Sequence, residues 1–149
     1  MQSNQVGKVL SLFISIKEST VPIHKIGINV DEQGIIGDKH YDTNIQRSVL
    51  ITSIESYYLA KEHQIEMPHS SLGENLLIDY NPYSLPVGSK LQIGNAIIEI
   101  SQNCTLCNHL SDIDKKLPKL LKNDRGIFGK IVKAGSIKVD DEIYLLKPQ

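Results

Sequence analysis

The stretch Lys90-Leu-Gln-Ile-Gly-Asn-Ala-Ile-Ile-Glu-Ile100 decides the class of fold. Two apolar segments, Lys90–Ile93 and Ala96–Ile100, flank the dipeptide Gly94-Asn95. A glycine-containing two-residue loop between such segments is typical of a tight β-hairpin. The second segment, extended to Ser101, is the strongest strand pattern in the chain. We therefore expect a protein built on β-sheet.

Short runs rich in Val, Ile, Leu and Phe recur along the rest of the chain and predict further strands. The expected strands are Val9–Ile16, Lys25–Val30, Arg47–Ile51, Glu74–Tyr80, Ile127–Ala134 and Glu142–Leu146. Gly34-Ile-Ile-Gly37-Asp38 is expected to form a glycine turn or a short strand, and Gly135-Ser136 to join the last two strands. Many short strands with glycine turns predict a mainly-β barrel.

Helices are expected at only one or two places. Thr52 and Glu55 have the spacing of a capping box and predict a short helix that ends near His63. A second helical pattern covers Ser111–Lys122, where Pro118 is expected to break or kink the helix. A βαβ fold needs more helices than this.

Length and composition restrict the class of protein. The 149 residues match one ordinary domain over 1–149, and 40% hydrophobic with 22% charged residues are typical of a globular chain. The net charge of −1 gives no indication of a nucleic-acid partner. The longest apolar runs are far shorter than the roughly 20 residues that span a bilayer, and the polar start lacks a signal-peptide core. We expect a soluble cytoplasmic domain without a membrane partner.

The two cysteines, Cys104 and Cys107, directly follow the strongest strand. Thiolates are soft ligands that suit zinc, copper, iron–sulfur clusters and molybdenum. Both cysteines could equally be small core residues, because cysteine is among the most buried residue types. His109 extends the motif towards a zinc site, but a structural zinc site needs four ligands and no second pair has the required spacing. A thioredoxin-like redox pair lacks its βαβ context.

Candidate anion-binding residues occur at three places. The segment Gly37-Asp38-Lys39-His40 follows a glycine turn, where backbone amides and cationic side chains could hold an anion; it could also be a turn with a solvated tip. Of 16 cationic residues only Arg47 and Arg125 are arginine. Their planar, forked donors suit phosphate or carboxylate, or pair with local acids such as Asp42 and Asp124.

Glu74 and Asn75 follow Gly73 and leave two interpretations open. They could orient a ligand, or they could tie a barrel turn through side-chain-to-backbone hydrogen bonds. The chain contains no Ser-His-Asp order, Walker loop or dinucleotide fingerprint, so neither an NAD nor a flavin motif is present.

Taken in order, several segments of the chain resemble the MOSC domain, named after the C-terminal part of molybdenum-cofactor sulfurases. The resemblance runs from about Val9 to Ile143. Its matching segments are Gly34-Ile-Ile-Gly-Asp-Lys-His40, Arg47-Ser-Val-Leu-Ile-Thr-Ser-Ile-Glu55, Gly73-Glu-Asn-Leu76, Leu85-Pro-Val-Gly-Ser-Lys-Leu-Gln-Ile-Gly94, Ile98-Glu-Ile-Ser-Gln102, Arg125-Gly-Ile-Phe-Gly129 and Lys133-Ala-Gly-Ser-Ile137.

The resemblance implies a β-barrel of the kind shared with the pyruvate-kinase barrel domain, and a role with the molybdenum cofactor, molybdopterin. By motif position Cys107 is the thiol that carries sulfur or ligates the metal, with Cys104 as a second thiol. The pterin phosphate is expected to meet cofactor-binding residues at Gly37, Asp38, Lys39, His40, Arg47, Glu74, Asn75 and Arg125. Two features depart from the family pattern: one residue fewer separates the cysteines, and Asp140 replaces a glycine.

The function that the resemblance implies is transfer of sulfur, or of the cofactor, to a molybdoenzyme or a cofactor-biosynthesis protein. The chain has no pyridoxal-phosphate sulfurase domain, so this role requires a sulfur-donor protein. One alternative is a molybdenum-dependent reductase of N-hydroxylated compounds, which needs an electron-donor protein because no flavin or iron–sulfur motif is present. Another is a non-catalytic module that binds a pterin or an oxyanion.

Overall fold

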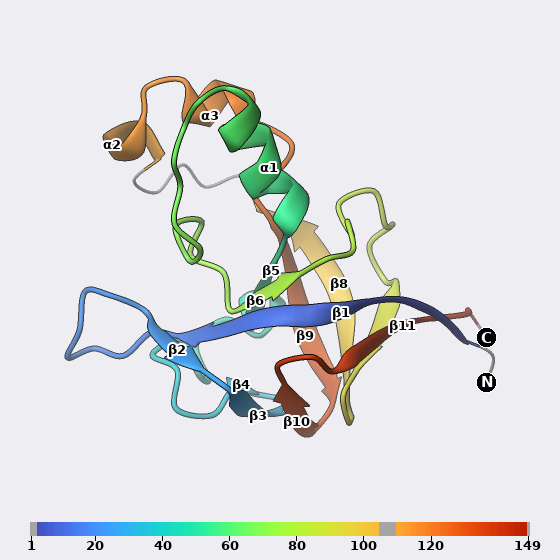
Figure 1. Ribbon diagram of the computed structural model, residues 1–149. Helices are drawn as coiled ribbons and strands as arrows, with labels where there is room; N and C mark the ends of the chain where they lie inside the picture. Colours follow the sequence, from blue (N-terminus) through green and yellow to red (C-terminus); the bar gives the residue numbers. More distant parts are fainter. Residues whose placement is uncertain (1–2, 105–109, 149) are drawn as a thin grey trace.

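The computed structural model describes residues 3–104 and 110–148. Within these ranges, eleven strands and three short α-helices follow one another (Figure 1). The elements are β1 (Ser3–Ile14), β2 (Ile23–Lys25), β3 (Gly27–Asp31), β4 (Gly34–Ile35), the 3-10 helix η1 (Ile45–Arg47), β5 (Val49–Ser53), α1 (Ile54–Glu62), β6 (Leu76–Ile78), β7 (Lys90–Ile93), β8 (Ala96–Asn103), α2 (Leu110–Ile113), α3 (Leu117–Leu120), β9 (Ile127–Lys133), β10 (Gly135–Lys138) and β11 (Glu142–Leu146).

The main sheet closes on itself and forms the predicted barrel. Its strands run in the order β11-β7-β8-β9-β5-β6-β1-β2, and a further pairing of β1 with β11 completes the ring. The hairpin of β7 and β8 pairs Lys90 with Glu99 and Ile93 with Ala96, as predicted from the sequence on either side of Gly94-Asn95. All pairings in the ring are antiparallel except that of β5 with β6, which are joined through α1. The mainly-β prediction is confirmed.

A second, three-stranded sheet lies beside the barrel in the order β10-β3-β4 (Figure 1). The expected plain connection at Gly135-Ser136 is wrong, because Gly135–Lys138 is itself a strand that pairs with β3. A side chain at Gly135 would lie 2.6 Å from the backbone of Asn95, so glycine lets the chain turn close against the hairpin there. The expected strand Lys25–Val30 is likewise two strands, interrupted at Ile26.

Three further boundaries differ from the predictions. Arg47 does not open a strand but ends η1, whose N-cap Asn44 accepts a hydrogen bond from the backbone of Gln46. The N-cap of α1 is Ser53 and not Thr52, because β5 stays buried through Ser53 and the helix begins one residue later. The segment expected as one helix over 111–122 forms α2 and α3, and Pro118 lies in the first turn of α3, where its missing N–H costs nothing.

The core has two parts on either side of β6. Leu76 and Ile78 point into the barrel, where apolar side chains from every strand of the ring are fully buried. Leu77, between them, points outward and packs with Tyr57 and Ala60 of α1 and with Leu117 of α3. Both faces of β6 are therefore covered, and the helices sit over one end of the barrel. No helix in the described ranges is long and apolar enough to cross a membrane.

Candidate functional site

A pocket of about 530 Å³ opens where the end of β1, the loop after β4, the loop before β6 and the end of β8 meet. This volume is in the range of small-molecule sites. Its polar lining is made of hydroxyl, amide and cationic groups, and no aspartate or glutamate occurs among the lining residues that the structure describes. The lining residues are Ser15, Thr20, Pro22, Lys39, His40, Thr43, Asn44, Arg47, Ser48, Leu50, Ser70, Ser71, Leu72, Gly73, Asn75, Cys104, Leu110, Arg125 and Phe128.

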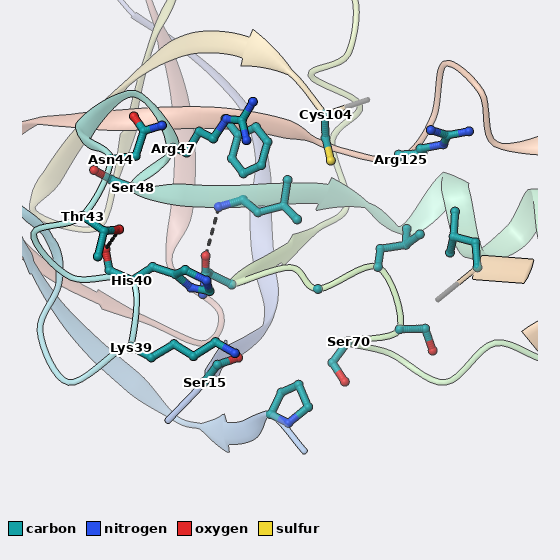
Figure 2. A pocket seen from close by; sticks show the side chains of 18 of the residues that line it. Ser15, Lys39, His40, Thr43, Asn44, Arg47, Ser48, Ser70, Cys104 and Arg125 are labelled. Atoms are coloured by element: carbon teal, nitrogen blue, oxygen red, sulfur yellow. Dashed lines mark hydrogen bonds between the residues drawn. The ribbon is translucent and has the colours of Figure 1, made fainter. Parts of the chain in front are cut away.

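Four cationic or potentially cationic side chains line this pocket: Lys39, His40, Arg47 and Arg125. Figure 2 shows Lys39 and His40 extending from one loop towards the middle of the pocket, with Arg47 and Cys104 along the upper side of the view. The guanidinium carbon of Arg47 lies 5.3 Å from the ring centroid of Phe128, a cation–π contact that holds the arginine in place. The lining therefore carries an excess of positive charge.

Arg125 is the buried member of this set, with 8% of its surface exposed. Its Nη2 donates a hydrogen bond of 2.6 Å to the carbonyl oxygen of Pro118, at the start of α3. Gly126 follows with φ +139°, and a side chain there would lie 2.9 Å from Leu50. Glycine at position 126 thus lets Arg125 approach β5 closely.

Cys104 lies in the pocket wall at the end of β8, in the position that the sequence predicts for a thiol at a strand end. It is 8% exposed and packs with Leu50 and Phe128. Its backbone N–H donates to the carbonyl oxygen of Gly126, 3.0 Å away. Cys107 and His109 lie outside the described residues. Among the residues that are described, no group of three or more potential ligands gathers into a metal site.

Asp38 belongs to the same loop as Lys39 and His40 but is not among the lining residues. Its side chain is only 2% exposed. Oδ1 accepts the backbone N–H of Ser15 at 2.7 Å, and Oδ2 accepts the backbone N–H of His40 at 2.9 Å. Gly37, just before it, has φ +93° and lies outside the lining. These two residues shape the loop from behind.

Asn75 lines the pocket, and its side chain bonds to two strands of the barrel. Oδ1 accepts the backbone N–H of Leu50 at 3.0 Å, and Nδ2 donates to the carbonyl oxygen of Phe13 at 3.2 Å. This geometry matches the interpretation of Asn75 as a residue that ties a barrel turn.

Glu74 is 1% exposed and lies behind the pocket wall. Its Oε2 accepts hydrogen bonds from Tyr57 Oη at 2.5 Å and from the backbone N–H of Ser70 at 3.1 Å. The fully buried hydroxyl of Thr52 lies beside this carboxyl group. Burial raises the pKa of Glu74, against the hydrogen bonds from Tyr57, the backbone and Thr52, which lower it. A carboxyl group in this environment favours its neutral form.

Sequence reasoning missed several polar residues of the pocket. Asn44 could have been found, because an asparagine before a short helical turn is a common N-cap. Ser15, Ser70 and Ser71 had no such signal, because serines of this kind become pocket residues only when distant loops meet.

The chain was compared with protein families, with curated proteins and with solved structures. The model of the MOSC domain family matches residues 16–144. No curated protein matches the sequence significantly. The crystal structure of the YuaD protein from Bacillus subtilis is similar with a TM-score of 0.82 and 20% identity, over 99% of this chain and 100% of that one.

Structures of YiiM proteins are also similar. YiiM from Geobacillus stearothermophilus has a TM-score of 0.68 and 15% identity, over 98% of this chain and 76% of that one. YiiM from Escherichia coli has a TM-score of 0.67 and 19% identity, over 95% of this chain and 71% of that one. At these identities the similarities show a shared fold.

Proposed function

The chain belongs to the MOSC domain family, and on this premise we propose that its pocket binds the molybdenum cofactor. One observation carries the proposal. Four cationic or potentially cationic side chains, Lys39, His40, Arg47 and Arg125, line a single cavity of about 530 Å³ in which the described lining has no acidic side chain. Such a cavity favours an anionic ligand of small-molecule size.

The chemistry of the lining fits this cofactor, a pterin phosphate that carries molybdenum on a dithiolene. Lys39, His40 and Arg47 would hold the phosphate, for which a forked guanidinium is the best donor among side chains. Asn44 and the pocket serines offer donors and acceptors for the polar edge of a pterin. The thiol of Cys104 in the wall is a soft ligand of the kind that suits molybdenum. When bound, the cofactor would supply redox chemistry that no side chain has.

We further propose that Cys107 is the sulfur-carrying thiol, on its motif position three residues after Cys104. Its thiolate attacks the outer sulfur of a donor protein's persulfide. A new S–S bond forms on Cys107, the S–S bond of the donor breaks, and the donor leaves as a thiolate. The step needs no external oxidant or reductant. The partners are then a sulfur-donor protein and a molybdoenzyme or cofactor-biosynthesis protein that receives the sulfur.

The proposal is tested by purifying the chain anaerobically, without a thiol reductant that would cleave a persulfide, from cells that make the cofactor. Molybdenum, pterin and cyanide-labile sulfur are measured per chain, and Cys107→Ser is compared with Cys104→Ser as the matched thiol variant. We expect the wild type to carry all three. Cys107→Ser is expected to lose the labile sulfur and to keep molybdenum and pterin.

Other outcomes separate the competing functions. Loss of molybdenum together with sulfur in Cys107→Ser indicates metal ligation by that thiol and favours the reductase of N-hydroxylated compounds. Loss of labile sulfur in Cys104→Ser alone moves the carrier role to that residue. A wild type without molybdenum or pterin contradicts the cofactor proposal.

A further inference from the structure

Ser15, Asp38, Lys39 and His40 form what we call the cationic corner of the pocket. The carboxyl group of Asp38 is buried at its centre and accepts from two separate segments. Oδ1 accepts the backbone N–H of Ser15 at the end of β1, at 2.7 Å. Oδ2 accepts the backbone N–H of His40 at 2.9 Å and lies 3.2 Å from Nδ1 of the same histidine. Asp38 therefore connects β1 to the loop after β4.

The other three residues of the cationic corner all line the pocket, whereas Asp38 does not. The backbone of Lys39 also donates to the carbonyl oxygen of Ser15 at 2.7 Å, so the two segments are held together at two points. The His40 side chain is 60% exposed and Asp38 is 2% exposed. The buried carboxylate therefore contacts the pocket only indirectly, through its hydrogen bonds to His40.

An ionised carboxylate only accepts hydrogen bonds, so the contact of 3.2 Å with Asp38 Oδ2 favours the form of His40 in which Nδ1 carries a hydrogen. Nε2 is then the nitrogen that gains or loses a proton. A neutral ring offers a lone pair at Nε2, which repels an oxyanion. A protonated ring offers a donor with a positive charge, and the adjacent carboxylate stabilises that charge.

We propose that Asp38 is a positioning residue that holds His40 in this orientation, and that His40 binds the anionic group of the ligand through Nε2 as an imidazolium. The inference rests on the proposed function, because it requires an anion in the pocket. It adds that anion binding is accompanied by proton uptake at His40 Nε2. An anion thereby drives its own binding group into the charged form.

The surroundings of His40 are consistent with this role. Among the described residues, the charged groups around the pocket that could act on the ring are Asp38 and Lys39 from its own loop, Arg47 from η1, and Arg125 before β9. The facing loop over 70–73 contributes only serine, leucine and glycine. A dianion bound among these groups favours a positive charge on the ring.

The test uses sulfate as the probe, because it is a tetrahedral dianion that does not itself take up a proton near neutral pH. Long-range ¹⁵N–¹H NMR of the histidine rings distinguishes the two neutral tautomers from the imidazolium. In the wild type we expect neutral His40 to be the Nδ1–H tautomer and sulfate to shift it towards the imidazolium. Arg47 guanidinium signals report independently on sulfate in the pocket.

Two variants and one control complete the test. Asp38→Asn is expected to move neutral His40 towards the Nε2–H tautomer and to lower sulfate affinity about fivefold, the size expected for a partly exposed charged hydrogen bond. His40→Gln is expected to lower sulfate affinity by a similar factor. This variant keeps Asp38 and its hydrogen bonds to the backbone, so it remains a test if Asp38→Asn does not fold. Asp79→Asn is the matched control, because Asp79 also accepts a backbone N–H, from Lys8, but lies outside the pocket lining.

Two results overturn the inference. One is a wild-type His40 in the Nε2–H tautomer. The other is sulfate that shifts the Arg47 signals of the wild type but leaves its His40 ring neutral, with Asp38→Asn and His40→Gln binding sulfate as tightly as the Asp79→Asn control. In the second case an anion still occupies the pocket, and the proposed function, which is tested by molybdenum and pterin content, stands unaffected.

Discussion

Two buried carboxyl groups support the two loops that form the pocket, and they differ in the donors that reach them. Asp38, in the loop after β4, accepts backbone N–H groups at both oxygens and contacts a histidine. Glu74, in the loop before β6, accepts one N–H and one tyrosine hydroxyl at the same oxygen, Oε2. N–H donors stabilise a carboxylate, and burial without them favours the neutral acid.

The difference assigns the two loops different tasks. The loop of Asp38 holds a negative charge that can support a cationic histidine facing the ligand. The loop of Glu74 holds a carboxyl group whose pKa is raised by burial and which accepts hydrogen bonds from Tyr57 and Ser70 behind the pocket wall. Both arrangements keep the described lining free of acidic side chains. Substitutions at each carboxyl group test this difference.

The largest effect is expected from removing the Glu74 side chain. Glu74→Ala leaves Tyr57 Oη and the Ser70 N–H buried without their acceptor and opens a cavity, so the free energy of unfolding should fall by about 3 kcal/mol. Glu74→Gln keeps an acceptor for Tyr57 Oη and the Ser70 N–H and offers an N–H to the Thr52 hydroxyl, so it should cost less than about 1 kcal/mol at neutral pH. Urea unfolding measures both. Equal losses in the two variants would show that Glu74 acts as a carboxylate.

The pH dependence of stability should report the same carboxyl group. The pKa of Glu74 is raised above its usual 4.5 in the folded state. The unfolded chain therefore releases this proton first, and the contribution of Glu74 is present below pH 4.5 and is lost as the pH rises towards the folded pKa. Across that window Glu74→Gln should gain stability relative to the wild type. A stability difference that is independent of pH would contradict the raised pKa.

At the other carboxyl group, Asp38→Asn should lower the free energy of unfolding by about 2 kcal/mol. The amide nitrogen replaces one of the two oxygens and cannot accept the backbone N–H of Ser15 or of His40. The exposed Asp79→Asn, which loses a similar bond to Lys8, should cost less than about 1 kcal/mol. Chemical unfolding compares the two. If Asp38→Asn costs no more than Asp79→Asn, Asp38 does not organise its loop.

The smallest effect on stability is expected at His40. Its ring is largely exposed, so His40→Gln should change the free energy of unfolding by less than about 0.5 kcal/mol. The same variant should still lose about fivefold in sulfate affinity, which separates binding from folding. Parallel unfolding and NMR titrations measure the two quantities. A loss of stability as large as that of Asp38→Asn would assign His40 to the fold.

Much of the barrel could be predicted from the sequence, because local patterns determine it. Alternating apolar residues and Gly94-Asn95 specify the β7–β8 hairpin without help from the rest of the chain. The boundaries that were wrong depend on contacts with distant segments. Ser53 caps α1 because β5 remains buried up to that residue, and Gly135 starts a strand because it packs on Asn95. The left-handed φ of +74° at Asp140 shows that the backbone keeps a conformation typical of glycine at the position where the family pattern has one.

The site could be predicted only where a residue type is informative by itself. Arg47 and Arg125 could be found because arginine is rare in this lysine-rich chain, and Cys104 because it follows a predicted strand. The structure brings all three to one pocket. The roles of Asp38 and Glu74 behind the wall could not be predicted, because each depends on a donor more than one turn away in the chain. Direct contact of Asp38 and Glu74 with the cofactor stays a prediction, as does the role of Cys107.

A pair of charge reversals tests whether the positive lining of this pocket binds the molybdenum cofactor. Lys39→Glu places a carboxylate in the pocket, whereas Lys130→Glu places one on β9, where the lysine pairs with Glu99 at 3.4 Å outside the pocket lining. Molybdenum and pterin are measured per chain after purification from cells that make the cofactor. We predict about a tenfold loss of both for Lys39→Glu and none for Lys130→Glu. Equal contents in the two variants would contradict the assignment of the pocket.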